Sequence, residues 1–158
     1  MANTQSMCTS FLGEVLTATH NFGTAPTRAT SAADTFKAAL YLASATVNAS
    51  TTAYSTTGEV TGTNYTPGGI TVTNGTSPLS TNASTTAGVA YWTPTSSLTY
   101  TNVTLSTAFD AVLIYNSSKS NKAVSVHTFG SQTVTAGTFT LTMPSNTTTT
   151  GLLRLATT

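Results

Sequence analysis

Apolar and small polar side chains alternate along the last third of the chain and predict the centre of a β-sheet. The alternation runs through residues 107–116 (TAFDAVLIYN), 122–129 (KAVSVHTF) and 137–144 (GTFTLTMP). The loop SSKSN separates the first two segments, and the connection GSQTVTAG separates the last two. A period of two is typical of half-buried strands, so we expect three consecutive antiparallel strands that form one wall of a sandwich.

The first of these segments is predicted to lie in the interior of the sheet. Phe109 and Leu113 occupy one face of the expected strand, and Val112 and Ile114 occupy the other. A strand with apolar residues on both faces is usually covered on both sides. We therefore expect residues 107–116 to form a central strand.

The N-terminal part of the chain has a different period, which predicts one helix. Apolar residues recur at helical spacing between Thr9 and His20 and form an amphipathic stripe. The polar residues 1–7 that precede it are expected to be loose, or to form an arm that orders on a neighbouring subunit. Residues 1–22 are thus predicted to be an N-terminal arm and helix.

Shorter apolar segments supply the remaining strands of the predicted β-sandwich domain, residues 23–158. We expect strands at DTFKAALYL (34–42), ITVTN (70–74), GVAYWTP (88–94), LTYTNVTLS (98–106) and LLRLA (152–156). The long connection at 44–69 is expected to be an ordered loop with a turn of helix near residues 53–57. About eight strands and one helix predict an all-β fold, either a single β-sandwich or a jelly-roll-like domain.

Composition indicates how such a domain could stay in solution with little charge. Threonine supplies about a quarter of the 158 residues, whereas charged residues make up 6% and the net charge is +1. The branched Cβ of threonine favours strands, and its hydroxyl tolerates water.

The low net charge provides no electrostatic surface for nucleic acid or an anionic membrane, and we expect neither partner. It also gives little repulsion between copies, which favours a homo-oligomer or a place inside a larger assembly.

Cysteine usage and the N-terminal sequence bear on the compartment. Cys8 is the single cysteine, so the chain cannot form an internal disulfide. The N-terminus has neither the basic start nor the apolar core of a signal peptide, and no run reaches the ~18 apolar residues of a membrane-spanning helix. We therefore expect synthesis in the cytosol.

Few groups are available for catalysis or metal binding: Glu14, His20, Asp34, Glu59, Asp110 and His127. No two of the acids are close enough in sequence to indicate a paired-carboxylate site, and the histidines lack metal-ligand spacing. Asp110 and His127 lie on strands expected to be neighbours, which leaves a Ser-His-Asp arrangement open, but no Gly-x-Ser-x-Gly sequence accompanies them. The favoured interpretation is that Asp110 pairs with Lys122 or Arg154, or accepts backbone hydrogen bonds. We expect no enzyme activity, no cofactor and no metal.

Aromatic residues are the remaining candidates for binding, because rings on a β-sandwich can stack on sugars. Tyr91 and Trp92 are adjacent, and neighbouring strand residues point to opposite faces, so at most one of the two is exposed. Burial in the core or contact with another subunit is the favoured role, and glycan binding is the weaker alternative. The candidate interaction surface comprises Phe11, Leu12, Tyr65, Trp92 and Tyr100.

Several stretches resemble a family of small proteins encoded in tailed-bacteriophage genomes. The most specific are AYSTTGEV and IYNSSKSNKAV, and the order of MCTSFLGEVLTATHNF and LLRLA at the two ends fits as well. Members of this family are described as virion structural proteins. The resemblance therefore implies a noncatalytic component of a virus particle, located in the virion after assembly in the host bacterial cytoplasm, and it brings no catalytic residues.

The resemblance leaves the position on the particle open. Our preferred expectation is a capsid decoration (cement) protein that stabilises the head by contacting the major capsid protein or other virion proteins. A tail or fibre component is the next alternative, and it includes a receptor- or glycan-binding module. An enzyme would require a pocket that unites Asp110 or Glu59 with His127.

Overall fold

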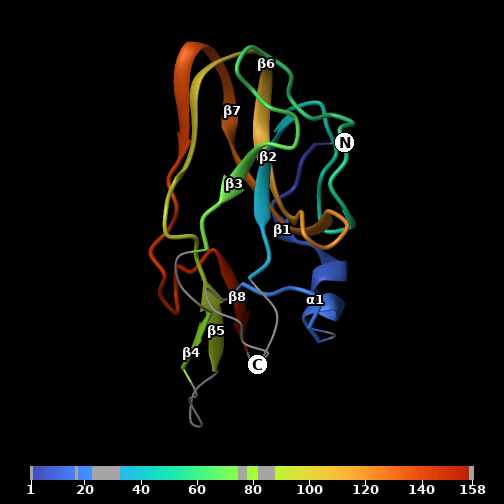
Figure 1. Ribbon diagram of the computed structural model, residues 1–158, viewed down its shortest axis with the longest axis vertical. Helices are drawn as coiled ribbons and strands as arrows, with labels where there is room; N and C mark the ends of the chain where they lie inside the picture. The colour runs from blue at the N-terminus through green and yellow to red at the C-terminus, as the bar shows by residue number, and fades with distance from the viewer. Residues whose placement is uncertain (1, 17, 23–32, 75–77, 82–87, 157–158) are drawn as a thin grey trace.

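The structure, a computed structural model, describes residues 2–16, 18–22, 33–74, 78–81 and 88–156. Within these ranges the elements are β1 (Ser6–Met7), α1 (Thr9–Leu16), β2 (Phe36–Leu42), β3 (Ile70–Val72), β4 (Leu79–Ser80), β5 (Val89–Trp92), β6 (Leu98–Asn116), β7 (Lys122–Leu141) and β8 (Leu153–Ala156). The strands form two antiparallel sheets, one in the order β1-β7-β6-β2-β3 and one in the order β4-β5-β8 (Figure 1). The predicted all-β, sandwich-like fold is confirmed.

A long hairpin of β6 and β7 forms the body of the protein. Its pairing runs from Asn116 and Lys122 beside the turn to Leu98 and Leu141 at the far ends. The sequence predicted four separate strands here, and that prediction was wrong, because two continuous strands replace them. The register between β6 and β7 shifts at five places, where one strand has more residues than the other, as in β-bulges. The pairing of the two strands therefore continues through these places.

The far part of β7 turns a sharp corner where the sequence predicted a connection. Phe129 and Phe139 would lie roughly 33 Å apart in a straight strand, yet their ring centroids are 5.2 Å apart. β6 follows the same corner, since the Tyr100 hydroxyl near its start donates a hydrogen bond of 2.8 Å to the carbonyl oxygen of Ala38 in β2. Both far ends of the hairpin thus fold back toward β2, with the bend at the top of Figure 1.

The half of β6 nearer the turn is the centre of the core, as its apolar residues on both faces predicted. β6 lies between β7 and β2, and Leu113 pairs with Val126 on one side and with Ala39 on the other. Each residue from Ala111 to Tyr115 is at most 2% exposed. This half of β6 is therefore covered on both faces of the sheet.

The small sheet contacts the large one through aromatic rings. Phe22 lies between the two, because its ring centroid is 4.3 Å from that of Phe36 in β2 and 4.8 Å from that of Trp92 in β5. β5 is the middle strand of the small sheet and pairs with both β4 and β8. The chain segment around Phe22 therefore joins the two sheets.

Residues 2–7 are attached to the large sheet and are not a loose arm, and Met1 of the predicted arm lies outside the described residues. Ser6 pairs with Val126 in β7, and the Asn3 side chain hydrogen-bonds Asp110, the Leu42 carbonyl and the Val47 amide. This differs from the expectation for residues 1–7, because polar side chains near the N-terminus find partners within the same chain.

Helix α1 is shorter than predicted and ends at Leu16 instead of near His20. The amide of Thr19 donates to the Glu14 carbonyl and that of Ala18 donates to the Val15 carbonyl. Ala18 has a φ of 54°. This pair of bonds with a left-handed residue is the Schellman arrangement that closes a helix.

The loop between β2 and β3 contains no turn of helix, contrary to the prediction for residues 53–57. Ala53 instead forms an isolated bridge with Lys122. At the end of the loop, Gly69 has a φ of 71°, and a Cβ on it would lie 1.6 Å from the Ala38 carbonyl oxygen. A glycine is required there because the loop backbone rests directly on β2.

Candidate functional site

Four of the five residues predicted to form an interaction surface are buried. Phe11 and Trp92 are each 2% exposed, Tyr100 is 3% exposed and Tyr65 is 8% exposed, whereas Leu12 is 45% exposed. Large rings remove the most apolar surface from water when they are buried, which favours their place in the core. Of the five predicted residues, Leu12 is therefore the one with an exposed side chain.

The buried residues nevertheless border two hollows. The first, which we call the apolar pocket, has a volume of about 440 Å³ and lies between α1 and strands β5 and β8. Its apolar lining includes Phe11, Val15, Phe22, Trp92, Leu153 and Leu155. A hollow of this size and character is within the range of ligand or side-chain binding sites.

The second hollow, which we call the tyrosine hollow, has a volume of about 400 Å³. Tyr65 and Tyr100 line it with their rings 6.0 Å apart and nearly parallel. Its polar lining includes Lys37, Asn64, Thr66, Thr71, Thr99 and Thr101. The sequence named these two tyrosines without indicating that they meet.

The tyrosine hydroxyls are engaged within the fold. Tyr54 and Tyr65 each donate a 2.7 Å hydrogen bond to the buried carboxylate of Glu59, which also accepts a bond from the Gly68 amide. Burial and, next, the bond to Glu59 raise the pKa of both tyrosines. They therefore remain protonated donors, and the Glu59 carboxylate joins separate parts of the loop between β2 and β3.

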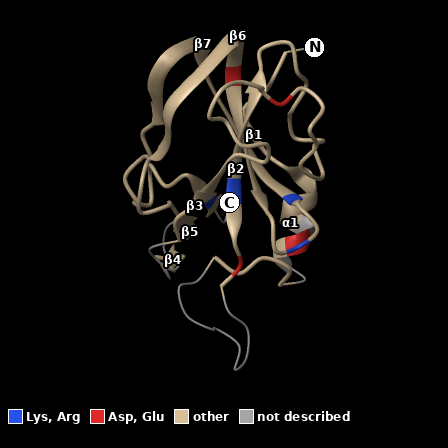
Figure 2. Cartoon of the chain, turned by 45° about the horizontal axis from the view of Figure 1, so that its top comes forward, with Lys and Arg blue, Asp and Glu red and all other residues tan. Residues whose placement is uncertain are grey.

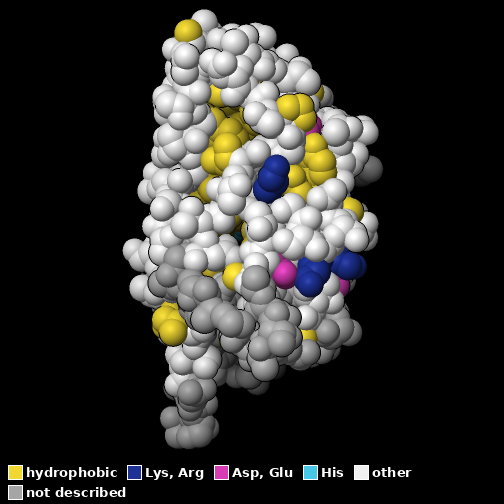
Figure 3. All heavy atoms as spheres, in the orientation of Figure 1, with side chains coloured by type: hydrophobic (Ala, Val, Ile, Leu, Met, Phe, Trp, Pro, Cys, Tyr) yellow, Lys and Arg dark blue, Asp and Glu magenta, His cyan; other side chains and the backbone are white. Residues whose placement is uncertain are grey.

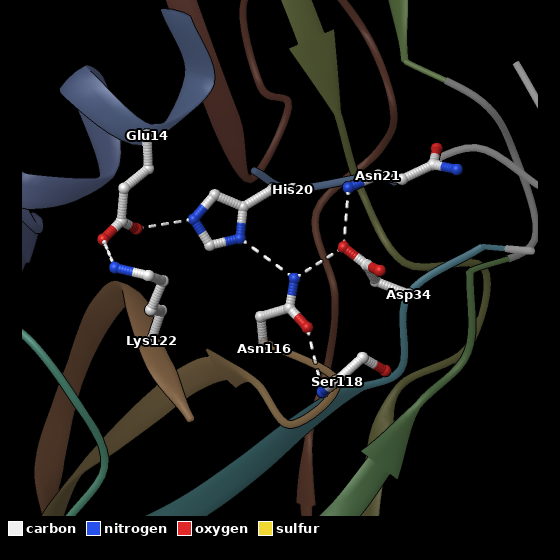
Figure 4. A network of polar contacts seen from close by, with 7 residues as sticks. All are labelled: Glu14, His20, Asn21, Asp34, Asn116, Ser118 and Lys122. Atoms are coloured by element: carbon white, nitrogen blue, oxygen red, sulfur yellow. Dashed lines mark hydrogen bonds and ion pairs between the residues drawn. The ribbon is translucent and has the colours of Figure 1, made fainter. Parts of the chain in front are cut away.

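A second polar cluster lies beside α1, where acidic and basic residues meet in a chain with few charges (Figure 2). Glu14 contacts His20 Nε2 at 2.7 Å and Lys122 Nζ at 2.5 Å (Figure 4). Asn116 donates to Asp34 Oδ2 at 2.8 Å and contacts His20 Nδ1 at 3.1 Å. The cluster ties the helix and the segment after it to the turn of the long hairpin.

The ion pair within this cluster favours the charged form of Glu14. Burial opposes ionisation, but the hydrogen bonds from Lys122 and His20 outweigh it and lower the pKa of the Glu14 carboxyl. Asp34 also accepts from the Asn21 amide and lies 3.7 Å from Lys119. Both carboxylates therefore serve as attachment points for the N-terminal segment.

His20 has no ring nitrogen left for a substrate, although it borders the apolar pocket. The Oδ1 atom of Asn116 accepts from the Ser118 amide, so its Nδ2 faces His20 and donates to Nδ1. With Nδ1 accepting from Asn116, Nε2 is the ring nitrogen that donates to Glu14. Both ring nitrogens of His20 are thus engaged in contacts within the fold.

Asp110 and His127 have separate partners. Asp110 accepts a 2.6 Å hydrogen bond from Asn3, and His127 Nε2 lies 2.9 Å from Ser125 Oγ. Burial lowers the pKa of His127 to about 4. The predicted pairing of Asp110 with Lys122 or Arg154 is wrong, because Lys122 binds Glu14 and Arg154 Nε donates to the Thr148 carbonyl.

Two further observations concern metals and membranes. In the described part of the chain, no group of three or more His, Cys, Asp and Glu side chains is placed to hold a metal ion. No helix there has the length and apolar character of a membrane span.

Cys8 is fully buried and has a free thiol, and burial is the main reason why its pKa rises to about 11.

Sequence reasoning missed the functions of Glu59 and Asn116. Glu59 stands in a Ser- and Thr-rich loop with no periodicity, and Asn116 reads as the ordinary start of a turn. The one usable signal is that Glu59 lies five residues after Tyr54 and six before Tyr65. In this chain, the lone acid between two isolated tyrosines marks a buried polar contact.

Comparison with known proteins adds no family or fold relative. No protein-family model matches the sequence, and neither a curated protein nor a solved structure matches it significantly.

Proposed function

We propose that this chain is a noncatalytic structural protein of a tailed-bacteriophage particle, and specifically a capsid decoration (cement) protein. The stretches AYSTTGEV and IYNSSKSNKAV, which resemble small virion proteins, are the reason for placing it on the particle. The observation that carries a structural role is that all four carboxylates and the His20 imidazole hold parts of the chain together, while the His127 imidazole contacts Ser125 of its own strand.

The shape and surface of the body support this role. In the long folded hairpin, the half of β6 next to the turn is buried on both faces, which makes the body a stiff support. Charged side chains are few on the face shown in Figure 3. Such a surface can lie against the major capsid protein and against further copies with little electrostatic repulsion.

Copy number tests this position on the particle. In purified particles of the phage that encodes the chain, quantitative mass spectrometry should find it in amounts comparable to the major capsid protein. A handful of copies per particle would move the protein to the tail. Complete lack of the chain from particles would overturn the virion role.

A second candidate function is glycan binding by a tail or fibre component. The observation in its favour is the tyrosine hollow, where two rings lie beside the Lys37 amine, the Asn64 amide and several threonine hydroxyls. Aromatic rings with surrounding hydroxyl and amide groups suit a neutral or acidic sugar.

A glycan array separates this candidate from the first. Binding that disappears in Lys37→Ala, and persists in the control Thr138→Ala on the exposed side of β7, would favour the glycan module. The tyrosines are unsuitable targets because their hydroxyls bond Glu59 and Ala38. Lack of binding to any sugar would remove this candidate.

A further inference from the structure

Lys37 differs from the other two lysines because it has no acidic partner in the described part of the chain. Lys119 Nζ lies 3.7 Å from Asp34, and Lys122 Nζ lies 2.5 Å from Glu14. No carboxylate oxygen of the described residues is within 4 Å of Lys37 Nζ. An ammonium group has three donors and no acceptor, so the charge and the donors of Lys37 are available to a bound molecule.

The place of Lys37 in β2 puts its ammonium group at the tyrosine hollow, which it lines. Lys37 pairs with Thr71 in β3 on one side and with Tyr115 in β6 on the other, and directly paired residues share a face of the sheet. Lys37 is partly buried, and its Nζ lies beside Gly68, since a Cβ built on Gly68 would be 3.8 Å from it. The fold therefore places this charge in the wall of the hollow.

The buried Glu59 carboxylate limits how much negative charge a ligand can bring. It accepts hydrogen bonds from Tyr54, Tyr65 and the Gly68 amide, so its charge is close to the hollow that Tyr65 lines. A ligand carboxylate carries one negative charge, which matches the single ammonium group of Lys37. A phosphate monoester carries about −1.5 to −2 at pH 7 and would leave excess negative charge near Glu59.

The rest of the lining suits a molecule with several hydroxyl groups. Thr66, Thr71 and Thr101 are exposed at the hollow, and their hydroxyls have no hydrogen-bond partner in the described part of the chain. Asn64 Nδ2 donates to the Asn102 carbonyl, which leaves Asn64 Oδ1 as an acceptor. The two tyrosine rings are at most 8% exposed, so a sugar cannot stack flat on them. Polar contacts must therefore determine the affinity.

We propose that the tyrosine hollow binds an acidic sugar through an ion pair between the sugar carboxylate and Lys37. The threonine hydroxyls and the Asn64 amide oxygen bind the sugar hydroxyls. The volume of about 400 Å³ is at the lower end of the range for ligand pockets and suits a short saccharide or the end of a longer one. This inference rests on the glycan candidate described above and adds the charge of the ligand to it.

Glycans that differ only in their acidic group test the ion pair. An array should carry oligosaccharides of galacturonic and glucuronic acid, their galactose and glucose counterparts, the 6-phosphates of these hexoses, and sialylated glycans with and without the sialic acid. The full chain should bind at least one carboxylate glycan about tenfold or more tightly than its neutral counterpart, and more tightly than the phosphate. N-acetylglutamate, a carboxylate without sugar hydroxyls, should not compete.

Substitutions then assign this preference to the hollow. Lys37→Gln removes the charge and keeps a donor, so the preference for the acidic sugar should fall about tenfold, whereas Lys37→Arg keeps the charge and should retain most of it. Thr71→Val removes only a hydroxyl and should weaken acidic and neutral sugars alike. Thr138→Ala, at an exposed position of β7, is the control. Circular dichroism checks that each variant is folded.

NMR of the natural chain supplies a readout that needs no variant. Titration with the acidic glycan that binds should shift the methyl signals of Thr66, Thr71 and Thr101 and leave that of Thr138 unchanged. Shifts confined to other parts of the chain would overturn the proposal, even if Lys37→Gln failed to fold.

Four further results would overturn the proposal. Equal binding of acidic and neutral counterparts would remove the ion pair and leave the glycan candidate standing. Tighter binding of the phosphates, or competition by N-acetylglutamate, would assign the hollow to another class of anion. An unchanged preference in folded Lys37→Gln would place the acidic group elsewhere. Lack of binding to any sugar would remove this inference together with the glycan candidate.

Discussion

Single residues in this protein act mainly by satisfying buried polar groups. Glu59 is 6% exposed and binds two tyrosine hydroxyls and a backbone amide. Asn116 is fully buried and joins His20 to Asp34. Unpaired buried groups are costly, so these side chains fix the loops that periodic patterning leaves undefined.

Gly69 should be the least replaceable glycine of the loop before β3. Gly69→Ala forces a Cβ to within 1.6 Å of the Ala38 carbonyl and keeps a φ of 71°, so we expect the free energy of unfolding to fall by more than about 1 kcal/mol. Gly130→Ala is the matched control, because nothing lies within 4 Å of its added Cβ. Urea unfolding measures both, and equal stability of the two variants would contradict the close approach.

His127 should make stability depend on pH between its two pKa values. Burial lowers its pKa to about 4 in the folded state, compared with about 6.5 when unfolded. The unfolded chain therefore binds more protons in this window, so stability rises with pH and is lost as pH falls from about 6.5 to 4. The full effect is about 3 kcal/mol.

The non-titrating variant His127→Gln tests this pH dependence. It should show a flatter dependence of the unfolding free energy on pH between 4 and 7 than the natural chain. Chemical unfolding at several pH values measures the difference. Equal slopes in both proteins would show that His127 is not responsible.

At the scale of elements, the alternation of side chains was a reliable guide to strands and a poor guide to their ends. β2, β3, β5 and β8 lie within the segments that the sequence predicted. The corner in β7 was predicted as a break, because small residues with glycine look the same at a bulge and at a turn. Only the partner strand decides whether pairing continues, and β6 follows β7 through the corner.

The N-terminal strand should contribute to the stability of the sheet. Removing residues 1–7 deletes β1 and the hydrogen bonds of Asn3 to Leu42, Asp110 and Val47. We expect a lower midpoint of thermal unfolding, since each lost bond contributes about 1 kcal/mol. Asn3→Ala should reproduce part of the loss. An unchanged midpoint of thermal unfolding in both variants would show that these residues do not stabilise the fold.

At the scale of the whole molecule, one hairpin supplies the central strand and the layer that folds over it. Whether an aromatic residue faces this core or the solvent could not be read from its position in a strand. Trp92 and Tyr100 therefore looked like surface candidates in the sequence, although both are buried. The pockets that they border depend on segments far apart in sequence and gave no local signal.

Disruption of the central strand should prevent folding altogether. Leu113→Asp places a charge where β6 is covered by β7 and β2, and Leu113 is fully buried. The cost of an unpaired buried charge is several kcal/mol, which is comparable to the whole free energy of unfolding of many domains. Thr99→Asp on the exposed side of β6 is the control. Soluble Leu113→Asp with an unaltered melting curve would show that the core lies elsewhere.

The turn between β6 and β7 has a consequence for the order in which the protein assembles itself. Ser120 and Asn121 adopt left-handed conformations there, and the first pairs of the ladder close around only a few residues. Strand pairing that begins at this turn closes only a short loop, and such local contacts form fastest. The bend near Phe129 and the docking of the N-terminal segment onto β7 would then come late and set the overall rate.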